Sequence, residues 1–359
     1  MKKRQSKKQP KTGRSLGRYL LGGILVLLVG AVFTLWAVQK ALVQPLAVED
    51  EGLRFEVASG GNLSSALRDL EQRGVLKWPR LVLAYAYWQG ETGIHAGEYL
   101  LPQGSNAMDL VSRLNRGDVT RYRVTLVEGW TFRQALAQVR AGRNIVQSEA
   151  GASPESAARA LGFEGDSPEG WIFPDTYVYR SGTSDVDLLR QARRRMEQVL
   201  DEEWQQRERD LPYSSPYEAL IMASLIEKET GLPSERSEIA GVFVRRLDRG
   251  MRLQTDPTVI YGLGDDYDGN LTRANLRQST PYNTYVIDGL PPTPIALPGR
   301  EAIRAALNPE PGDSLYFVGK GDGSHHFSST LAEHNRAVRE YQLKRRADYR
   351  SSPAEKGAE

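Results

Sequence analysis

A charged end on an apolar segment is the feature of this sequence with the residue types for catalysis. The stretch "ASLIEKETG", residues 223–231, places two glutamates around one lysine directly after a run of apolar side chains. Ser215 and Glu218 match the S-x-x-E pattern of a helix start, and the glycine that ends the stretch is a typical helix stop. The sequence therefore predicts a helix from about Pro216 to Thr230 that is apolar nearly all round and buried.

Glu227 is the carboxyl group that such a helix would keep protonated. At about 100° per residue it falls on the stripe of Leu220, Ala223 and Ser224, whose small members would leave room for a ligand. An apolar neighbourhood disfavours a charged carboxylate, and so does the negative end of the helix dipole. Both effects raise the pKa of Glu227. A carboxylic acid that stays protonated near neutral pH is suited to general acid catalysis on an acetal oxygen.

An ion pair is the alternative interpretation of the same residues. Glu227 or Glu229 would then pair with Lys228 or with an arginine of the next helix. Charged residues are common at helix ends, so E-K-E taken alone is a weak signal for catalysis.

A second group of residues is suited to holding a sugar chain. Tyrosine rings stack on the CH faces of sugars, and amide, hydroxyl and carboxylate groups bond to sugar hydroxyls, although each residue could equally serve ordinary packing. The candidates for substrate contact are Gln254, Asp256, Tyr261, Tyr282, Asn283 and His325.

Several other site classes lack their sequence patterns. The chain has no G-x-S-x-G or S-x-x-K pattern of a serine hydrolase and no glycine-rich phosphate loop. The H-E-x-x-H pattern is also missing, so we expect no metal site and no cofactor.

The N-terminal region has the composition of a membrane anchor. Residues 1–18 contain eight basic residues and no acidic one, and residues 19–39 are uncharged and apolar. A helix of this length crosses a hydrocarbon core of roughly 30 Å, and the basic flank favours a cytoplasmic N-terminus. A cleaved signal peptide is the alternative, but its apolar part is usually shorter and ends in a small-x-small site. Either interpretation exports residues 41–359.

The exported part has a composition that excludes two classes of function. The 359-residue chain contains no cysteine, so it has neither disulfides nor a thiol nucleophile. Beyond residue 40 there are 38 basic against 45 acidic residues, a net charge of −7. This acidic balance argues against nucleic-acid binding.

The periodicity predicts an α+β fold. Residues 53–57 and 96–101 alternate like strands and enclose two helices, which makes a compact βααβ unit. A third helix, 106–116, follows, and the rest of the chain mixes helices and strands. "GLPPTPIALPG", residues 289–299, has four prolines and predicts a rigid extended loop.

Four long segments resemble a known family. "ASLIEKETG", "GVFVRRLDRGMRLQTDPTVIYGLG", "PYNTYVIDGLPPTPIALPG" and "LYFVGKGDGSHHFSSTLAEHN" are closely similar to segments of the MltG (YceG-like) endolytic murein transglycosylases. The likeness covers about residues 53–345 in order. It implies a bacterial inner-membrane protein that cleaves nascent peptidoglycan between N-acetylmuramic acid (MurNAc) and N-acetylglucosamine (GlcNAc), which ends strand elongation. It also implies peptidoglycan synthases of the elongation machinery as partners.

The resemblance assigns roles along the chain. The first glutamate of E-K-E-T is the family's catalytic residue, which is Glu227 here. The implied organisation is a basic cytoplasmic arm, a transmembrane helix, a linker, a LysM-like subdomain, a catalytic periplasmic domain and a disordered tail, at residues 1–18, 19–39, 40–52, 53–117, 118–349 and 350–359.

A single acid is enough for the implied reaction. A usual glycoside hydrolase needs two carboxylates, whereas a lytic transglycosylase lets the muramic C6 hydroxyl attack C1 and form a 1,6-anhydro end. Glu229 and Asp256 are the only nearby candidates for a second carboxylate, and neither is assigned a nucleophilic role. A peptidoglycan glycoside hydrolase and a non-catalytic peptidoglycan-binding scaffold are the alternative functions.

Overall fold

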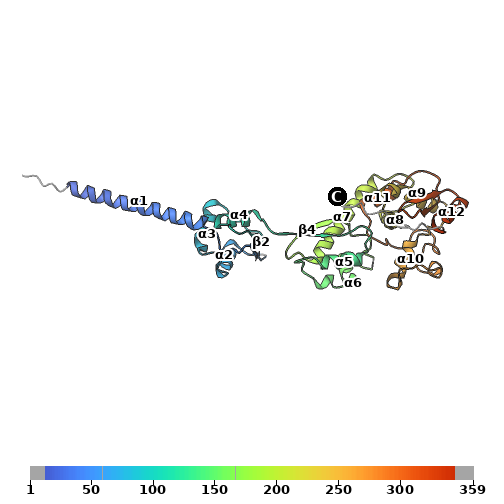
Figure 1. Ribbon diagram of the computed structural model, residues 1–359, viewed down its shortest axis with the longest axis horizontal. Helices are drawn as coiled ribbons and strands as arrows, with labels where there is room; N and C mark the ends of the chain where they lie inside the picture. Colours follow the sequence, from blue (N-terminus) through green and yellow to red (C-terminus); the bar gives the residue numbers. More distant parts are fainter. Residues whose placement is uncertain (1–12, 59, 166, 344–359) are drawn as a thin grey trace, which may run out of the picture. The chain divides into compact units, whose positions relative to one another are not determined.

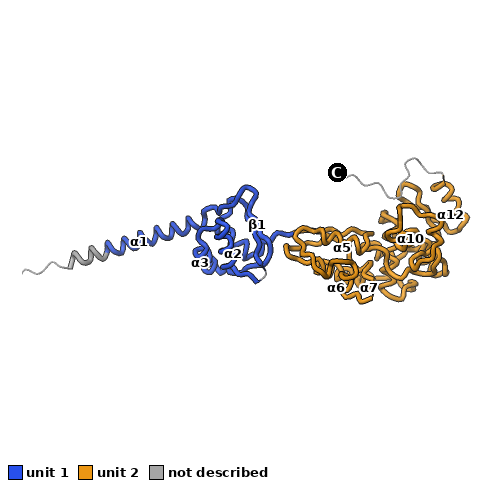
Figure 2. The backbone as a smooth tube through the Cα atoms, turned by 90° about the horizontal axis from the view of Figure 1, so that it is seen from below, with its two compact units in different colours: residues 1–121 blue, residues 122–359 orange. Residues whose placement is uncertain are grey.

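The computed structural model describes residues 13–58, 60–165 and 167–343, and these form two compact units (Figures 1 and 2). The units divide between Arg121 and Tyr122, a few residues after the predicted boundary at residue 117. The reason is that Val119 bridges to Tyr99 and is buried in the core of the first unit. The predicted tail, 350–359, and most of the basic arm lie outside the described residues.

Helix α1, Gly13–Val43, contains the predicted membrane span. Within Leu21–Val43 an 18-residue window has a mean hydropathy of 2.4, and side chains such as Leu27 are 75% exposed. By length and composition this helix could cross a membrane. The helix continues past the predicted end of the span at residue 39 as far as Val43, and it buries Leu42 in the core of the first unit.

The first unit has the predicted βααβ order followed by one more helix. Its strands pair antiparallel, with Leu53 opposite Leu101 and Phe55 opposite Tyr99, and the two rings stack with centroids 5.6 Å apart in the core. The elements are β1 (Leu53–Val57), α2 (Leu63–Gln72), α3 (Pro79–Gln89), β2 (Gly97–Leu101) and α4 (Ala107–Arg116).

The second unit is mostly helical, with two small two-stranded sheets among its described residues. The sheets pair β3 (Arg121–Thr125) with β4 (Thr176–Arg180), and β5 (Tyr316–Gly319) with β6 (His325–Ser328). The helices are α5 (Phe132–Arg140), α6 (Pro154–Ala160), α7 (Asp185–Gln205), α8 (Pro216–Glu229), α9 (Arg236–Asp248), α10 (Asp256–Leu263), α11 (Arg300–Leu307) and α12 (Leu331–Val338). Helix α12 is followed directly by a π-helical turn, Arg339–Leu343. The α+β class is therefore confirmed.

Helix α8 lies in the core of the second unit, as its composition predicted. Every residue from Ala219 to Ile226 is buried, and α7, α9, α10 and α11 pack around the helix (Figure 1). Ser215 Oγ accepts a hydrogen bond from Glu218 N, and Glu218 Oε2 accepts one from Ser214 N. The helix begins at Pro216 and ends at Glu229, with Thr230 already extended.

The small residues beside Glu227 serve packing, so the prediction that they leave room for a ligand was wrong. Ala223 and Ser224 are fully buried. Ser224 Oγ donates to Ile221 O at 2.7 Å and accepts from Ile295 N at 3.0 Å. Small side chains are needed here because the backbone of the proline-rich segment, residues 289–299, passes directly over the helix.

The variant Ser224→Ala is expected to lower the free energy of unfolding by about 1–3 kcal/mol, because the buried N–H of Ile295 loses its acceptor. The shift of the urea midpoint measures this loss. Ser214→Ala, at an exposed position near the start of the same helix, is the control. A change equal to that of the control would mean that this bond does not hold the segment on α8.

Candidate active site

Glu227 lies in the last turn of α8 with its side chain only 6% exposed. Its Oε2 accepts a hydrogen bond from Gly299 N at 2.9 Å, and its Oε1 lies 3.4 Å from Arg236 Nη2. The ion pair that the sequence left open therefore forms, with an arginine of the next helix. It does not exclude chemistry, because the same carboxyl group also lines a cavity.

The proline-rich segment places the backbone N–H that faces Glu227. Leu297 N donates to Trp130 O at 2.7 Å, and Gly129 N donates to Leu297 O at 2.9 Å. The segment is thus held between α8 and residues 129–130, which brings Gly299 to the carboxyl group. A Cβ at Gly299 would meet the carboxylate of Glu128, so a larger residue here would push that side chain aside. Lys228 Nζ donates to Gly129 O at 3.2 Å from the outer side of α8.

Burial has the largest effect on the acidity of this group. Desolvation raises the pKa of Glu227, the Gly299 N–H and the Arg236 and Lys228 cations oppose that rise, and the neighbouring Glu128 carboxylate adds to it. The net direction is upward, as the sequence predicted. The site therefore favours a protonated acid and also has partners ready for its carboxylate.

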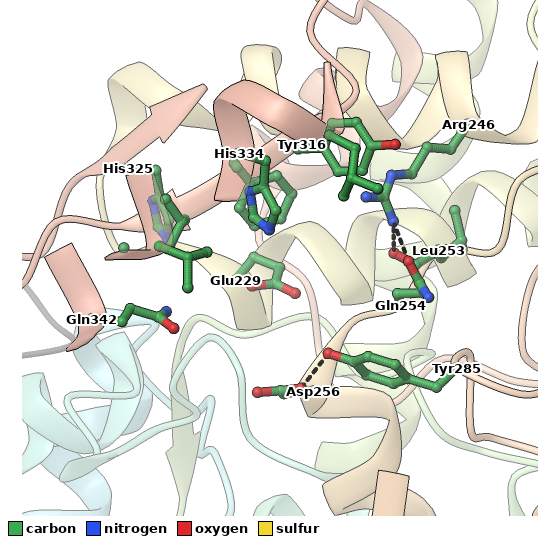
Figure 3. Close-up of a pocket in the computed structure, with 15 residues that line it drawn as sticks. Glu229, Arg246, Leu253, Gln254, Asp256, Tyr285, Tyr316, His325, His334 and Gln342 are labelled. Carbon is green, nitrogen blue, oxygen red and sulfur yellow. Dashed lines mark hydrogen bonds between the residues drawn. The ribbon is translucent and has the colours of Figure 1, made fainter. Parts of the chain in front are cut away.

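The cavity that Glu227 lines is a groove of about 770 Å³. It adjoins a second cavity of about 380 Å³, and both are lined by Glu229, Asp256, Gly319, His325 and Gln342. The second cavity extends to Arg246 and Tyr316 (Figure 3). Such a groove has the size for a polymer with several sugar rings.

Glu229 is the second carboxyl group of α8 that reaches the groove. Thr255 Oγ1 donates to it, and burial raises the pKa of Glu229 to about 7. Asp256 lies across the cavity, where its Oδ1 accepts from Tyr285 Oη at 2.7 Å (Figure 3). Glu229 and Asp256 therefore remain candidates for a second carboxylate.

Of the six predicted contact residues, Asp256 and His325 line the groove together with Glu227, and Gln254 lines the second cavity. Gln254 has a φ of 53°, a left-handed conformation that costs a non-glycine residue of order 1–3 kcal/mol. Its backbone N donates to Thr284 O at 3.2 Å, and Arg246 Nη1 donates to its side chain at 3.5 Å. His325 Nδ1 lies 2.8 Å from Glu235 Oε2, which fixes the ring at the edge of the groove.

The other three predicted contact residues are occupied elsewhere. Asn283 is fully buried, and its Nδ2 donates to the carbonyls of Asn275, Leu276 and Gln278, so it fixes a loop; we withdraw it as a substrate contact. Neither of the two tyrosines lines the two cavities described above. Tyr282 Oη bonds to Thr293 Oγ1 at 3.0 Å, and Tyr261 Oη donates to Glu169 Oε2 at 3.1 Å. Sequence composition could not separate these roles, because Tyr and Asn serve loops and sugar sites alike.

Glu169, the residue that accepts the hydrogen bond from Tyr261, is a buried acid. It also accepts from Phe132 N at 2.8 Å at the start of α5, and burial raises the pKa of Glu169 to about 7. The folded state therefore keeps a proton between pH 4.5 and 7 that the unfolded state has lost. The free energy of unfolding falls as the pH rises through this window, by up to about 3 kcal/mol from this one group.

The variant Glu169→Gln is expected to reduce that fall, because it does not titrate while its amide oxygen can accept from Phe132 N and its amide N–H can donate to Tyr261 Oη. Urea unfolding at pH 5 and pH 7.5, in detergent solution, measures it. Glu229 has a pKa raised to the same region, so part of the pH dependence should remain. A variant with the full wild-type pH dependence would show that Glu169 is ionised in the folded state.

Glu128 escaped the sequence analysis, and Arg236 was expected only as an unspecified arginine of the next helix. Glu128 lies 3.6 Å from Arg236 Nη2, so the guanidinium is shared between Glu128 and Glu227. Glu128 thereby joins Glu229 and Asp256 as a nearby carboxylate, which corrects the expectation that those two were the only ones. No local pattern marks Glu128 or Arg236, since each reaches Glu227 only through the packing of other elements.

Comparison with known proteins gives a consistent result. The profile of the YceG-like family matches residues 55–340. The endolytic murein transglycosylase of Bacillus subtilis (strain 168) is 30% identical over 321 residues, 84% of this chain and 88% of that one. The protein of the same name from Streptococcus pneumoniae serotype 2 (strain D39) is 27% identical, over 79% of this chain and 57% of its own length.

A solved structure agrees with these matches. The crystal structure of a YceG-like protein from Listeria monocytogenes superposes with a TM-score of 0.51 at 26% identity, covering 80% of this chain and 99% of that one. The family profile alone spans well over half of the chain. The chain therefore belongs to the YceG-like family.

Proposed function

We propose that the protein is an endolytic murein transglycosylase that cleaves the MurNAc–GlcNAc bond of peptidoglycan, with Glu227 as its catalytic acid. The family and the names of the relatives support the substrate. The observation that carries the assignment to this chain is the buried Glu227 carboxyl group, which lines the groove and faces the Gly299 N–H.

The proposed reaction needs this one acid and no water. Glu227 donates its proton to the glycosidic oxygen, and the bond between that oxygen and C1 of the muramic residue breaks. The muramic C6 hydroxyl oxygen then bonds to C1 and gives its proton to the Glu227 carboxylate. The products are a free GlcNAc hydroxyl end and a 1,6-anhydro-MurNAc end, and the acid is restored.

The groups that face the Glu227 side chain can stabilise its carboxylate after the proton has been donated. Once the proton has left, the carboxylate keeps the Gly299 N–H bond and faces the Arg236 guanidinium. Hydrogen bonds and charges that are already in place stabilise a developing charge without reorganisation. Because burial opposes the same charge, the carboxylate remains basic enough to take the C6 hydroxyl proton back.

We place the enzyme at the bacterial inner membrane, spanned once by α1, with the N-terminus in the cytoplasm and the catalytic unit in the periplasm. The apolar length of α1 and the basic residues before it support this topology. In this position the enzyme would act on nascent strands as a terminase beside peptidoglycan synthases. The βααβ order of the first unit supports a LysM-like, glycan-binding subdomain there.

A peptidoglycan hydrolase is the second candidate, favoured by the extra carboxyl groups. Glu128, Glu229 and Asp256 all line the groove, and one of them would have to activate water or act as nucleophile. Mass spectrometry of a peptidoglycan digest decides between the two. We expect muropeptides with anhydro ends, each lighter by one water than a reducing end. Reducing ends would refute the transglycosylase, and the absence of any cleavage would leave a binding scaffold.

A further inference from the structure

Helix α3 presents a mostly apolar face to solvent. Val82 and Ala86 face the core of the first unit, whereas Tyr87 and Trp88 are 70% and 80% exposed. Trp78, directly before the helix, is 62% exposed. Aromatic side chains gathered in this way at a surface mark an interaction site.

The geometry of α1 brings the first unit close to the bilayer. A hydrocarbon core of roughly 30 Å takes about 20 residues, so a span that begins at Leu21 ends near Lys40. Lys40 Nζ lies 5.1 Å from the ring centre of Trp36, a pairing that suits the headgroup level. Leu42, about 3 Å further along the helix, is already buried in the core of the first unit. The headgroup layer is roughly 5–7 Å deep on each side, so the unit must begin inside it.

The part of the unit that lies at this level is the start of α3. A cavity of about 110 Å³ is lined by Ala41 and Gln44 at the end of α1 and by Lys77, Trp78 and Val82 of the α3 region. Figures 1 and 2 both show α3 at the end of the unit where α1 enters, with the strands β1 and β2 on the other side.

We propose that the exposed face of α3, formed by Trp78, Arg80, Ala84, Tyr87 and Trp88, docks into the headgroup layer of the bilayer that α1 crosses. The inference rests on the proposed membrane span. Trp and Tyr rings prefer the boundary between headgroups and acyl chains.

The charges of the segment agree with a lipid surface. Arg80 is the only charged residue of α3, and Lys77 lies just before it, so both can face lipid phosphates. A glycan strand is the competing occupant. It would need free hydrogen-bonding side chains beside the rings. Gln89, next to Trp88, already donates to Tyr85 Oη at 3.1 Å, and the other polar neighbours, Lys77 and Arg80, are cations that suit lipid phosphates.

Spin labels on single cysteines test the proposal in the full chain, which has no cysteine of its own. The three variants are Ala84→Cys on the exposed face of α3, Glu56→Cys on exposed β1, and Leu28→Cys within α1. Each is reconstituted in nanodiscs of phosphatidylethanolamine and phosphatidylglycerol. Collision rates with oxygen, which dissolves in lipid, and with a water-soluble nickel chelate then report the depth of the label.

The label at residue 84 is expected to collide with oxygen several-fold more, relative to nickel, than the label at residue 56. The label at residue 28 should be the deepest. Equal values at residues 84 and 56 with a deep label at residue 28 would refute the docking alone. A water-exposed label at residue 28 would refute the membrane span and the docking with it.

Two further variants, with the label kept at residue 84, test the contacts themselves. Trp88→Ser and Arg80→Glu are each expected to move the label towards water, whereas Glu98→Gln, on β2, should not. Unchanged depth in both α3 variants would overturn the role given to this face. Added glycan strands should leave the spectrum unchanged, and immobilisation of a nickel-accessible label by them would assign the face to glycan instead.

Discussion

Replacing Glu227 with glutamine is expected to slow glycan cleavage by roughly 10²–10⁴-fold, the usual contribution of a positioned general acid. The amide oxygen can still accept the Gly299 N–H bond, so the local geometry should persist, but no acidic proton remains for the glycosidic oxygen. The rate at which muropeptides with anhydro ends appear from purified peptidoglycan measures the effect.

Two other glutamates give matched controls for this substitution. Glu301→Gln, at a half-exposed ion pair with Arg304 on α11, should leave the rate unchanged. Glu229→Gln should keep the anhydro product, since the proposed reaction uses one acid. If Glu227→Gln released anhydro ends at the wild-type rate, the catalytic assignment would be wrong. If Glu229→Gln alone stopped cleavage, a two-carboxylate hydrolase would be favoured.

Replacing Arg236 with methionine is expected to lower kcat by roughly 10–100-fold, the contribution of a hydrogen bond to a charged group. The side chain of Arg236 is only 10% exposed and faces Glu227, so its loss leaves the newly formed carboxylate with the Gly299 N–H as its remaining close partner. Arg236→Lys, which keeps a cation at the site, should recover part of the rate. An unchanged kcat in the methionine variant would show that the guanidinium does not act on Glu227.

The same variant should also move the pH profile, and the direction follows from the sign of each neighbour. Cleavage needs protonated Glu227, so kcat/KM falls as the pH rises through its pKa. Arg236 favours the carboxylate, and without it the pKa of Glu227 rises and the alkaline limb moves to higher pH. Glu128 disfavours the carboxylate, so Glu128→Gln should move the limb to lower pH. Shifts in the same direction for both variants would contradict this arrangement.

Local sequence patterns were enough to predict much of the scaffold. The alternation of residues 53–57 and 96–101 predicted the strands β1 and β2, and the cap at Ser215 predicted the start of α8. Such patterns work because strand pleating, helix periodicity and capping bonds act over only a few neighbouring residues. The same signals missed α10 and α11, which are eight residues each and whose burial depends on neighbours far away in sequence.

The environment of Glu227 could not be read in this way. Gly299 donates to it from 72 residues further along the chain. Glu128 is 99 residues before it, and Arg236 faces it only because α9 turns back against α8. For Asn283 the sequence prediction was wrong. Its residue type suits a sugar contact, but in the structure its side-chain amide donates to backbone carbonyls and fixes a loop.

The sequence by itself therefore determined the long apolar helix near the N-terminus, the buried helix α8 and the acid at its end, because each depends on residues adjacent along the chain or one helical turn apart. It also determined that the pKa of Glu227 is raised, since the apolar residues of the same helix keep water away from the carboxyl group. Only the tertiary structure decided which groups stabilise the charged acid and which side chains line the groove. Those contacts join segments whose approach depends on how the whole unit packs, and no local pattern encodes that packing.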